Sequence, residues 1–462
     1  MNERRKHRLG LMEMLGTALL MGFAPMASWA TEPPPTVVPT PAAPGKAPVE
    51  DSAPTLTLGD LELIALANNP TLAQAAAQID ISRGKALQAG LYPNPTFGYT
   101  GEQMGARGVP GAGFGERQGA YFQQEIVTGG KLRLSRAKYQ QEAFAAEVQA
   151  QAQRLRVLNG IQIAFYEILA SQEGIELHRI LVKNADEAVA TTKELVNAGQ
   201  ANEADSLQAE IEARRSRVSL KNAETRYRRN WEHLTTVIGE PNLKPRVLEG
   251  SLVSDGPGVE WEASLAQLLQ ESPEIQFALA EVRRDQITVQ RERQEPIPNA
   301  IVRAATGYNF ETRSATADVS VGFRIPVFDR NQGTIKQAQA DLMRAQAEVT
   351  RVELSLRNRL ADAFSRYNTA MESSKDFRDV SLPKARKVLE LYSDSYKRRR
   401  AAWPQVLVAQ RSYYQYGEEY LNALADLRRA EVEIRGMLLM DGLKAPPGPT
   451  PSGHIDATPR PR

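Results

Sequence analysis

The chain repeats one plan twice, and this duplication constrains its fold more than any other feature. Prolines and a glycine of the first half recur at the same spacing in the second half. The matched positions are Pro70 and Pro273, Pro93 and Pro296, Pro95 and Pro298, and Gly130 and Gly333. Proline fixes the backbone and glycine frees it, so matched pairs indicate matching changes of chain direction. The repeated unit is too long for a solenoid repeat. It indicates that the fold consists of two similar halves.

Each half is predicted to contain a helix, two short strands, a long helix and a further helix. The expected helices of the first half are 58–90, 131–198 and 202–238, with strands at 96–104 and 118–127. The second half is expected to have helices at 261–294 and 334–399 and a last one ending near 440, with strands at 300–310 and 316–327. Pro383 is expected to bend the long helix of this half. Two shorter helices stacked end to end match one long helix in length. Each half therefore predicts two helical columns of equal height, which suit the wall of a cylinder.

The long helix of the first half carries apolar residues at steps of three and four. These residues are Phe144, Val148, Ala152, Leu155, Leu158, Ile161, Phe165 and Ile168. A narrow stripe of this kind is typical of coiled-coil helices, which pack on neighbours along one side and leave the other side wet.

The expected strands alternate apolar and polar residues. In 316–327 one side carries Ala317, Val319, Val321, Phe323, Ile325 and Val327, and the other side is polar. An apolar outer face with a polar inner face is typical of transmembrane β-barrels, and a hairpin on a soluble core is the alternative. Four strands cannot close a barrel, and an open edge in lipid leaves backbone groups without partners. We therefore expect several copies, such as three, to complete the barrel.

Composition argues against an enzyme. The 462 residues include no cysteine and 4 histidines, and the formal net charge is +2. The lack of cysteine excludes thiolate chemistry, disulfides, cysteine zinc sites and a lipidated N-terminal cysteine, and the charge gives no indication of nucleic-acid binding. The Gly129-Gly130-Lys131 segment lacks the other residues of a phosphate loop, and His178 and His233 lack a second histidine at i+4. We expect no catalytic site, no cofactor and no metal site.

The N-terminus is predicted to be an export signal. Arg4, Arg5, Lys6 and Arg8 precede an apolar stretch that ends in small residues around Ala30, and a retained membrane anchor is the alternative. Proline-rich segments at both ends are expected to be flexible. The expected domains are a signal peptide (1–30), a proline-rich segment (31–54), the first repeat (55–242), the second repeat (243–443) and a proline-rich tail (444–462).

Four short sequence motifs resemble those of a known protein family. They are Ala67-Asn-Asn-Pro70, Gly90-Leu-Tyr-Pro-Asn-Pro95, Glu125-Ile-Val-Thr-Gly-Gly-Lys131 and Pro326-Val-Phe-Asp-Arg-Asn-Gln-Gly333. With the duplicated plan, they resemble the TolC-like outer-membrane efflux family over the whole span from about Leu56 to Leu443. The last two phrases are similar to the cobalt–zinc–cadmium resistance (CzcC-type) branch.

The resemblance implies a mainly α-helical protein with a small β part. Coiled-coil hairpins would form a helical barrel in the periplasm, and four strands per protomer would form a β-barrel in outer-membrane lipid, closed by homotrimerisation. The tunnel would receive substrate from an inner-membrane resistance-nodulation-division pump through a periplasmic adaptor. The expected substrates are divalent heavy-metal cations, with drugs or other small molecules as the alternative. A periplasmic coiled-coil adaptor or structural protein is the alternative from a different class.

The resemblance also implies a gate at the two helix-hairpin tips, 197–205 and 397–405. Asp205 matches an acidic residue of the family, and Tyr396 matches a tyrosine that can hydrogen-bond to it. The neighbouring basic residues Arg398, Arg399 and Arg400 would supply an ionic latch to Asp205, whereas a solvated turn or an adaptor-docking surface is the alternative. Gln405 and Val408 stand where some members have aspartates, so an acidic ring at the entrance is in doubt.

Overall fold

The computed structural model describes residues 55–102, 116–253, 258–398, 400–445 and 454. The predicted signal peptide, the proline-rich segment before residue 55 and nearly all of the proline-rich tail lie outside the described residues.

The first half follows the predicted order but has one more helix. Its elements are α1 (Leu58–Asn68), α2 (Pro70–Ala89), β1 (Thr96–Glu102), β2 (Arg117–Ile126), α3 (Lys131–Asn197) and α4 (Glu203–Ile238). The prediction of one helix over 58–90 was wrong, because Pro70 begins a new helix. Asn69 caps that helix by accepting a hydrogen bond from the Thr71 N–H at 2.9 Å. Proline suits a first helical position, since the N–H that it lacks would have no partner there.

The second half shows the same break. Its elements are α5 (Trp261–Glu271), α6 (Pro273–Gln294), β3 (Ala300–Asn309), β4 (Ser314–Phe323), α7 (Gln332–Asp376), η1 (Phe377–Ser381), α8 (Leu382–Lys397) and α9 (Trp403–Arg435). Ser272 caps α6, which begins at Pro273, so the prediction of a single helix over 261–294 was also wrong. The short π-helix η1 ends at Ser381, two residues before Pro383. A proline removes one backbone donor, and a π-turn accommodates that loss within a long helix.

The matched glycines play different roles in the two halves. Gly130 adopts φ 67° directly before α3, as its predicted turn requires. Before α7, Asn331 takes the left-handed conformation with φ 61°, and Gly333 lies inside the helix. Asparagine is one of the few non-glycine residues that tolerate this conformation. The expectation that Gly333 frees the backbone here was therefore wrong.

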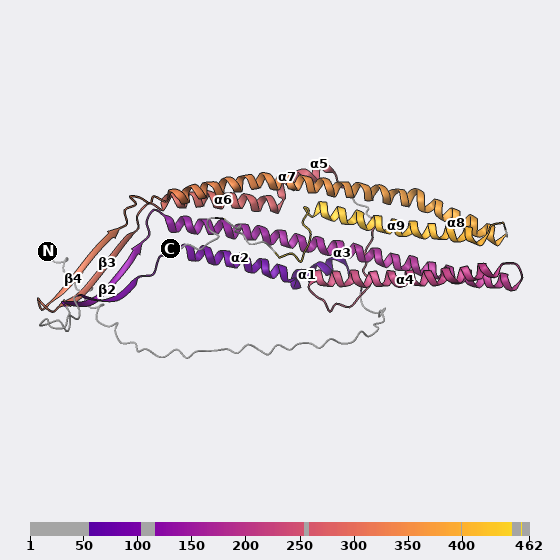
Figure 1. Ribbon diagram of the computed structural model, residues 1–462, viewed down its shortest axis with the longest axis horizontal. Coiled ribbons are helices and arrows are strands. Elements are labelled where there is room, and N and C mark those ends of the chain that lie inside the picture. The colour runs from indigo at the N-terminus through magenta and orange to yellow at the C-terminus, as the bar shows by residue number, and fades with distance from the viewer. Residues whose placement is uncertain (1–54, 103–115, 254–257, 399, 446–453, 455–462) are drawn as a thin grey trace, which may run out of the picture. The chain divides into compact units, whose positions relative to one another are not determined.

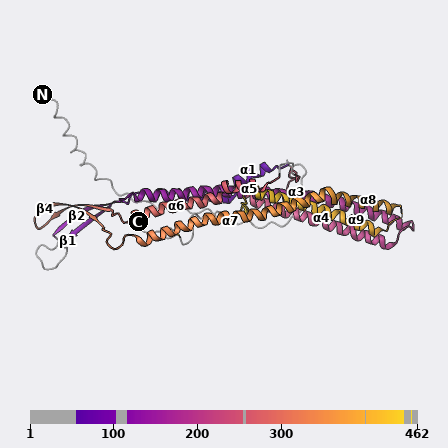
Figure 2. The same ribbon diagram turned by 90° about the horizontal axis from the view of Figure 1, so that it is seen from above.

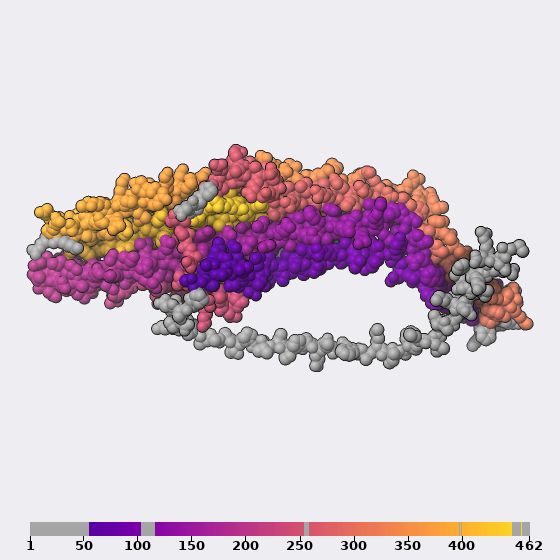
Figure 3. All heavy atoms as spheres, turned by 180° about the vertical axis from the view of Figure 1, so that it is seen from behind, coloured from indigo at the N-terminus to yellow at the C-terminus, as the bar shows by residue number. Residues whose placement is uncertain are grey.

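The helices contact one another as the predicted columns require. Both α2 and α4 pack on α3, and α6 and α9 each pack on both α3 and α7. Figure 1 shows α2 and α4 following one another along α3. In Figure 3 the yellow surface of α9 lies between the orange surface of α7 and α8 and the magenta surface of α3 and α4. The column that contains α6 and α9 therefore lies between α3 and α7 of the same chain.

The strands form one antiparallel sheet in the order β1-β2-β3-β4. The registers place Phe97 opposite Phe122, Ala304 opposite Val319, and Val302 opposite Val321. The predicted alternation is confirmed within β4, because apolar residues pair with apolar residues on one face of the sheet. The predicted strand was too long, since β4 ends at Phe323 and leaves Ile325 and Val327 outside it. Polar residues such as Arg303 and Ser320 pair on the other face.

Apolar packing is concentrated where the shorter helices meet the long ones. One cluster surrounds Trp231, which is 1% exposed, and joins α1, α3 and α4. A second cluster joins α5, α7 and α9 around Leu356 and Leu360. The predicted stripe of α3 is largely buried within the chain, whereas Phe144 is 41% exposed there. Within the described part of the chain, no helix combines the length and the apolar character needed to cross a bilayer.

Candidate functional site

The sheet carries an apolar face that none of the described residues covers. Its large residues, each between 44% and 78% exposed, are Phe97, Tyr99, Phe122, Tyr308, Val319, Val321 and Phe323. In water, an exposed apolar patch of this kind indicates an interaction with lipid or protein. The outer strands β1 and β4 each pair on one side only among the described residues, so both sheet edges are open.

The opposite face of the sheet is polar, and two arginines on it contact other side chains of the sheet. Arg117 forms an ion pair with Asp318, and the Arg303 guanidinium lies over the Tyr121 ring at 4.4 Å. At the base of the strands, Asn299 donates a hydrogen bond to Glu125 at 2.7 Å. This face can border water, while the apolar face can border hydrocarbon.

The two helix hairpins, α3–α4 and α8–α9, end side by side in the same region (Figure 1 and Figure 2). Their tips share an apolar cluster that combines buried residues of α4 and α9 with partly buried residues of α3 and α8. Its members are Ala209, Trp403, Val406, Leu407, Ala188, Val189, Leu389 and Tyr396. The tips within one chain are therefore joined mainly by apolar burial.

The predicted gate residues Asp205 and Tyr396 lie close together at this cluster. Burial raises the pKa of the Tyr396 phenol, and the nearby carboxylate of Asp205 raises that pKa further. The Tyr396 hydroxyl is buried and has no hydrogen-bond partner among the described residues. The hydrogen bond from Tyr396 to Asp205 is therefore not formed within a single chain.

The described basic residues next to Tyr396 have partners other than Asp205 within the chain. Arg398 pairs with Asp394 of its own helix at 3.0 Å, and the Arg400 backbone N–H donates to Ser395 at 2.7 Å. Gln405 accepts a hydrogen bond from the Ala402 N–H at 3.3 Å and so caps α9. Arg399 lies outside the described residues. A latch between Arg398 or Arg400 and Asp205 is not formed within the described chain.

Polar contacts that the sequence did not predict join the two hairpins along α3, α4 and α9. We call this boundary the hairpin seam. Asn184 donates to the Tyr414 hydroxyl at 2.7 Å, and the Arg411 Nε lies 3.1 Å from a Glu212 carboxylate oxygen. The His178 Nε2 lies 2.9 Å from a Glu418 carboxylate oxygen. These partners are far apart in the sequence, and no local spacing indicates them.

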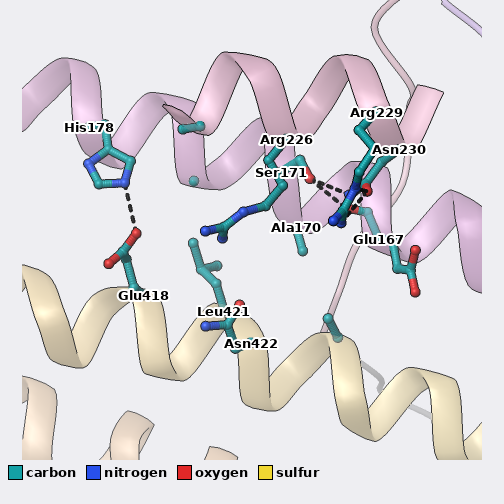
Figure 4. Close-up of a pocket in the computed structure, with 13 residues that line it drawn as sticks. Glu167, Ala170, Ser171, His178, Arg226, Arg229, Asn230, Glu418, Leu421 and Asn422 are labelled. Carbon is teal, nitrogen blue, oxygen red and sulfur yellow. Dashed lines mark hydrogen bonds and ion pairs between the residues drawn. The ribbon is translucent and has the colours of Figure 1, made fainter. Parts of the chain in front are cut away.

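A small cavity of about 180 Å³ opens at the seam beside His178 (Figure 4). Its buried polar residues are His178, Ser171 and Asn230, which come from α3 and α4. Arg226 and Arg229 of α4 are exposed at its edge, and Glu418 faces it from α9. The hydrogen bond from His178 lowers the pKa of the Glu418 carboxyl, although burial opposes that shift.

No group of three or more metal-ligating side chains converges anywhere in the described ranges. Neither His178 nor its neighbours in the cavity form such a group. The most distinctive surfaces are therefore the two-faced sheet and the hairpin tips, which suit a conduit.

Comparison with known proteins agrees with this geometry. The family model for outer membrane efflux proteins matches the chain twice, over residues 64–240 and 264–438. The cobalt-zinc-cadmium resistance protein CzcC of Cupriavidus metallidurans is 25% identical over 391 residues, which cover 84% of this chain and 91% of CzcC.

Solved structures share the fold. The outer-membrane channel OprN has a TM-score of 0.70 at 18% identity, covering 84% of this chain and 91% of its own. The outer membrane protein VceC of Vibrio cholerae has a TM-score of 0.68 at 17% identity, and the match covers 82% of this chain and 96% of VceC. The chain belongs to the outer membrane efflux protein family, whose members are channel proteins and not enzymes.

Proposed function

We propose that three copies of this chain join through the open edges of β1 and β4 into a closed barrel in the outer membrane, with the helices forming a tunnel in the periplasm. The observation that carries this proposal is a four-stranded sheet with an exposed apolar face and two unpaired edges. Each backbone group without a partner costs several kcal/mol in lipid, so a stable membrane sheet must close on itself. Export by a signal peptide over 1–30 would bring the chain there.

The duct would act passively in a tripartite system, with a periplasmic adaptor and an inner-membrane resistance-nodulation-division pump as partners. Divalent heavy-metal cations are the proposed substrates, supported by the 25% identity to a cobalt-zinc-cadmium resistance protein. Selection among ions would then take place upstream, in the pump.

A deletion strain tests both the duct and its substrate. Loss of the gene should increase sensitivity to cobalt, zinc and cadmium, with little change toward dyes and antibiotics. Increased sensitivity to dyes and antibiotics alone would instead favour a drug channel of the same fold.

Native mass spectrometry of the detergent-purified protein should give a trimer, and a water-soluble monomer would contradict the duct.

Two matched variants connect the phenotype to the sheet. Val319→Lys places a charge on the apolar face, where a lysine at mid-bilayer costs about 2–4 kcal/mol. Ser320→Lys places the same charge on the polar face, one residue away. Val319→Lys should fail to restore metal resistance and Ser320→Lys should restore it. Equal rescue by the two variants would contradict the membrane placement.

The tip residues are the proposed gate of this duct. In the closed trimer, a carboxylate, a phenol, a basic run and an amide would link neighbouring hairpins across the aperture. These residues are Asp205, Tyr396, Arg398, Arg399, Arg400 and Gln405. Exposed ion pairs contribute about 0–1 kcal/mol each, so several must act together. The double variant Asp205→Ala, Arg400→Ala should raise single-channel conductance in planar bilayers. Unchanged conductance would remove these two residues from the gate.

A further inference from the structure

The chain passes between the helices and the sheet four times, and its two halves use equivalent loops to do so. An entry loop leads from a helix into the first strand of each half, at 90–95 and 295–299. An exit loop leads from the second strand of each half into the long helix, at 127–130 and 324–331. Prolines at matching positions lie in both entry loops, and a residue in the left-handed conformation ends both exit loops. All four loops lie where the sheet meets the helices (Figure 1).

The exit loop of the first half and the entry loop of the second half pack on each other within the chain. The Thr128 hydroxyl donates a hydrogen bond to the Pro298 carbonyl at 2.6 Å. The Lys131 amino group, at the first residue of α3, donates to the Ile297 carbonyl at 2.6 Å and to Asn299 at 2.9 Å. These loops meet because β2 and β3 are antiparallel neighbours, so the end of β2 lies beside the start of β3. We call this contact the internal joint.

The other two loops are left exposed by the described residues. In the entry loop of the first half, Leu91 is 46% exposed and Tyr92 is 67% exposed. In the exit loop of the second half, Ile325 is 78% exposed, Val327 is 59% exposed and Phe328 is 92% exposed. These loops flank β1 and β4, the two strands with an open edge. Apolar side chains gathered at an exposed site indicate contact with a protein or with lipid.

We propose that these two loops meet between neighbouring copies, so that the exit loop of one copy packs its apolar residues on the entry loop of the next. The inference rests on the ring proposed above, in which β4 of one copy pairs with β1 of the next. Neighbouring strands are antiparallel throughout the sheet. The same pairing between copies brings the end of β4 beside the start of β1, and so repeats the arrangement of the internal joint. Phe328 of one copy then packs near Tyr92 of the next.

The chemistry of the exit loop favours a second copy over lipid as the partner. The exposed charged residues Arg324, Asp329 and Arg330 flank its apolar residues in the sequence. Burying such charges in hydrocarbon is costly, whereas a protein contact buries the apolar side chains and leaves the charged ends in water. The joint between copies is apolar where the internal joint is hydrogen-bonded. Apolar burial is non-directional, which suits a contact that forms after each chain has folded.

The chain has no cysteine, so a pair of introduced cysteines reports this contact in the full-length protein in detergent. Tyr92→Cys combined with Phe328→Cys should join copies through a short thiol crosslinker and give covalent dimers and trimers on a denaturing gel. Ile297→Cys combined with Phe328→Cys is the matched control. Ile297 is 42% exposed, but its loop is already engaged in the internal joint. The control pair should leave the copies unlinked.

Native mass spectrometry of the same samples before crosslinking separates this inference from the proposed ring. A trimer whose Tyr92 and Phe328 cysteines do not crosslink would overturn the joint between copies and leave the ring standing. The same result is expected if the exit loop faces lipid. The absence of a trimer would overturn the ring and the joint together. Equal crosslinking of the two cysteine pairs would also overturn the joint, because it indicates random collision.

Truncation of the aromatic ring tests what the contact contributes. Phe328 is almost fully exposed on its own chain, so Phe328→Ala should leave the fold of the chain unchanged. The variant should lower by several degrees the temperature at which the trimer dissociates in sodium dodecyl sulfate, because it removes apolar surface from the joint. Phe328→Leu retains most of that surface and should dissociate near the temperature of the parent protein. Equal dissociation temperatures for the parent protein and Phe328→Ala would overturn the apolar contact.

Discussion

The two joints at which shorter helices meet end to end are built differently. At the first joint, between the end of α4 and the start of α2, the two helix ends are in direct contact. Asn69 donates from its side-chain amide to the Val237 carbonyl at 2.6 Å. Gly239 turns the chain with φ 84°, and a Cβ added there would lie 2.6 Å from the Asn68 carbonyl oxygen. The first joint has no room for a side chain at this glycine.

The second joint, between the end of α9 and the start of α6, is bridged by a side chain from a third helix, α7. Arg359 of α7 lies 3.0 Å from a Glu274 carboxylate oxygen and donates to the Leu438 carbonyl at 2.6 Å. A cavity of about 630 Å³ lies beside this bridge. Gln149 lines that cavity, and both polar atoms of its side chain are buried without partners among the described residues.

The duplication repeats the positions at which the chain turns, but not the way in which the helix ends are joined. Proline begins the second helix at both joints. Direct packing then fills the first joint, whereas the second keeps a void and a buried amide without partners. Because voids and unsatisfied groups weaken packing, we expect the first joint to be the more rigid of the two.

The largest expected effect comes from filling the first joint. Gly239→Ala should lower the free energy of unfolding by about 3 kcal/mol, because it combines a left-handed backbone with a backbone clash. Gly199→Ala is the control, since Gly199 has φ 67° with open space around its Cβ position, and should cost about 1 kcal/mol. Urea unfolding followed by circular dichroism measures both. Equal losses would show that the first joint is not tightly packed.

A smaller difference in the free energy of unfolding is expected between substitutions of two glutamines that lie one turn apart on α3. Gln153 is fully buried and donates to Thr71 at 2.8 Å and to the Gly442 carbonyl at 3.0 Å. Gln153→Met should lower the free energy of unfolding by about 2 kcal/mol, because it removes two buried hydrogen bonds. Gln149→Met should leave that free energy unchanged or raise it, since methionine removes an unsatisfied amide. A loss in Gln149→Met as large as in Gln153→Met would mean that the Gln149 amide has a partner in the assembled protein.

The smallest effect concerns the bridge itself. Arg359→Met should lower the free energy of unfolding by about 1 kcal/mol, because the guanidinium is partly exposed and water compensates part of the loss. Arg351→Met is the control, since Arg351 forms its ion pair with Glu348 of its own helix and is well exposed, and should change little. If the Arg359 variant unfolds at the same urea concentration as the control, the second joint does not depend on its bridge.

Much of the fold could be predicted from residue spacing, because its elements end at residues with strong backbone preferences. Gly130 and Gly239 mark the ends of helices by the conformations that they permit. The breaks at Pro70 and Pro273 were missed, although a capping residue directly before each proline is a recognisable signal. The strand alternation was predicted correctly because a two-faced sheet requires it.

The contacts between hairpins could not be predicted in the same way. Glu212 and Arg411 meet only because two long helices pack in one particular register, and residue spacing along either helix does not specify that register. The same holds for His178 and Glu418, since histidine spacing alone indicated only that no zinc pair was present. The proximity of Asp205 to Tyr396 was expected from family resemblance and not from local pattern.

The open edges of β1 and β4 also affect whether a mutation in these strands is dominant or recessive. A ring of identical subunits uses every edge, so one copy with a damaged edge breaks the continuity of the whole wall. In a cell that makes both sound and damaged copies, random mixing would place a damaged copy in most threefold rings. A mutation that harms an edge strand would therefore be dominant, whereas one that only reduces synthesis would be recessive.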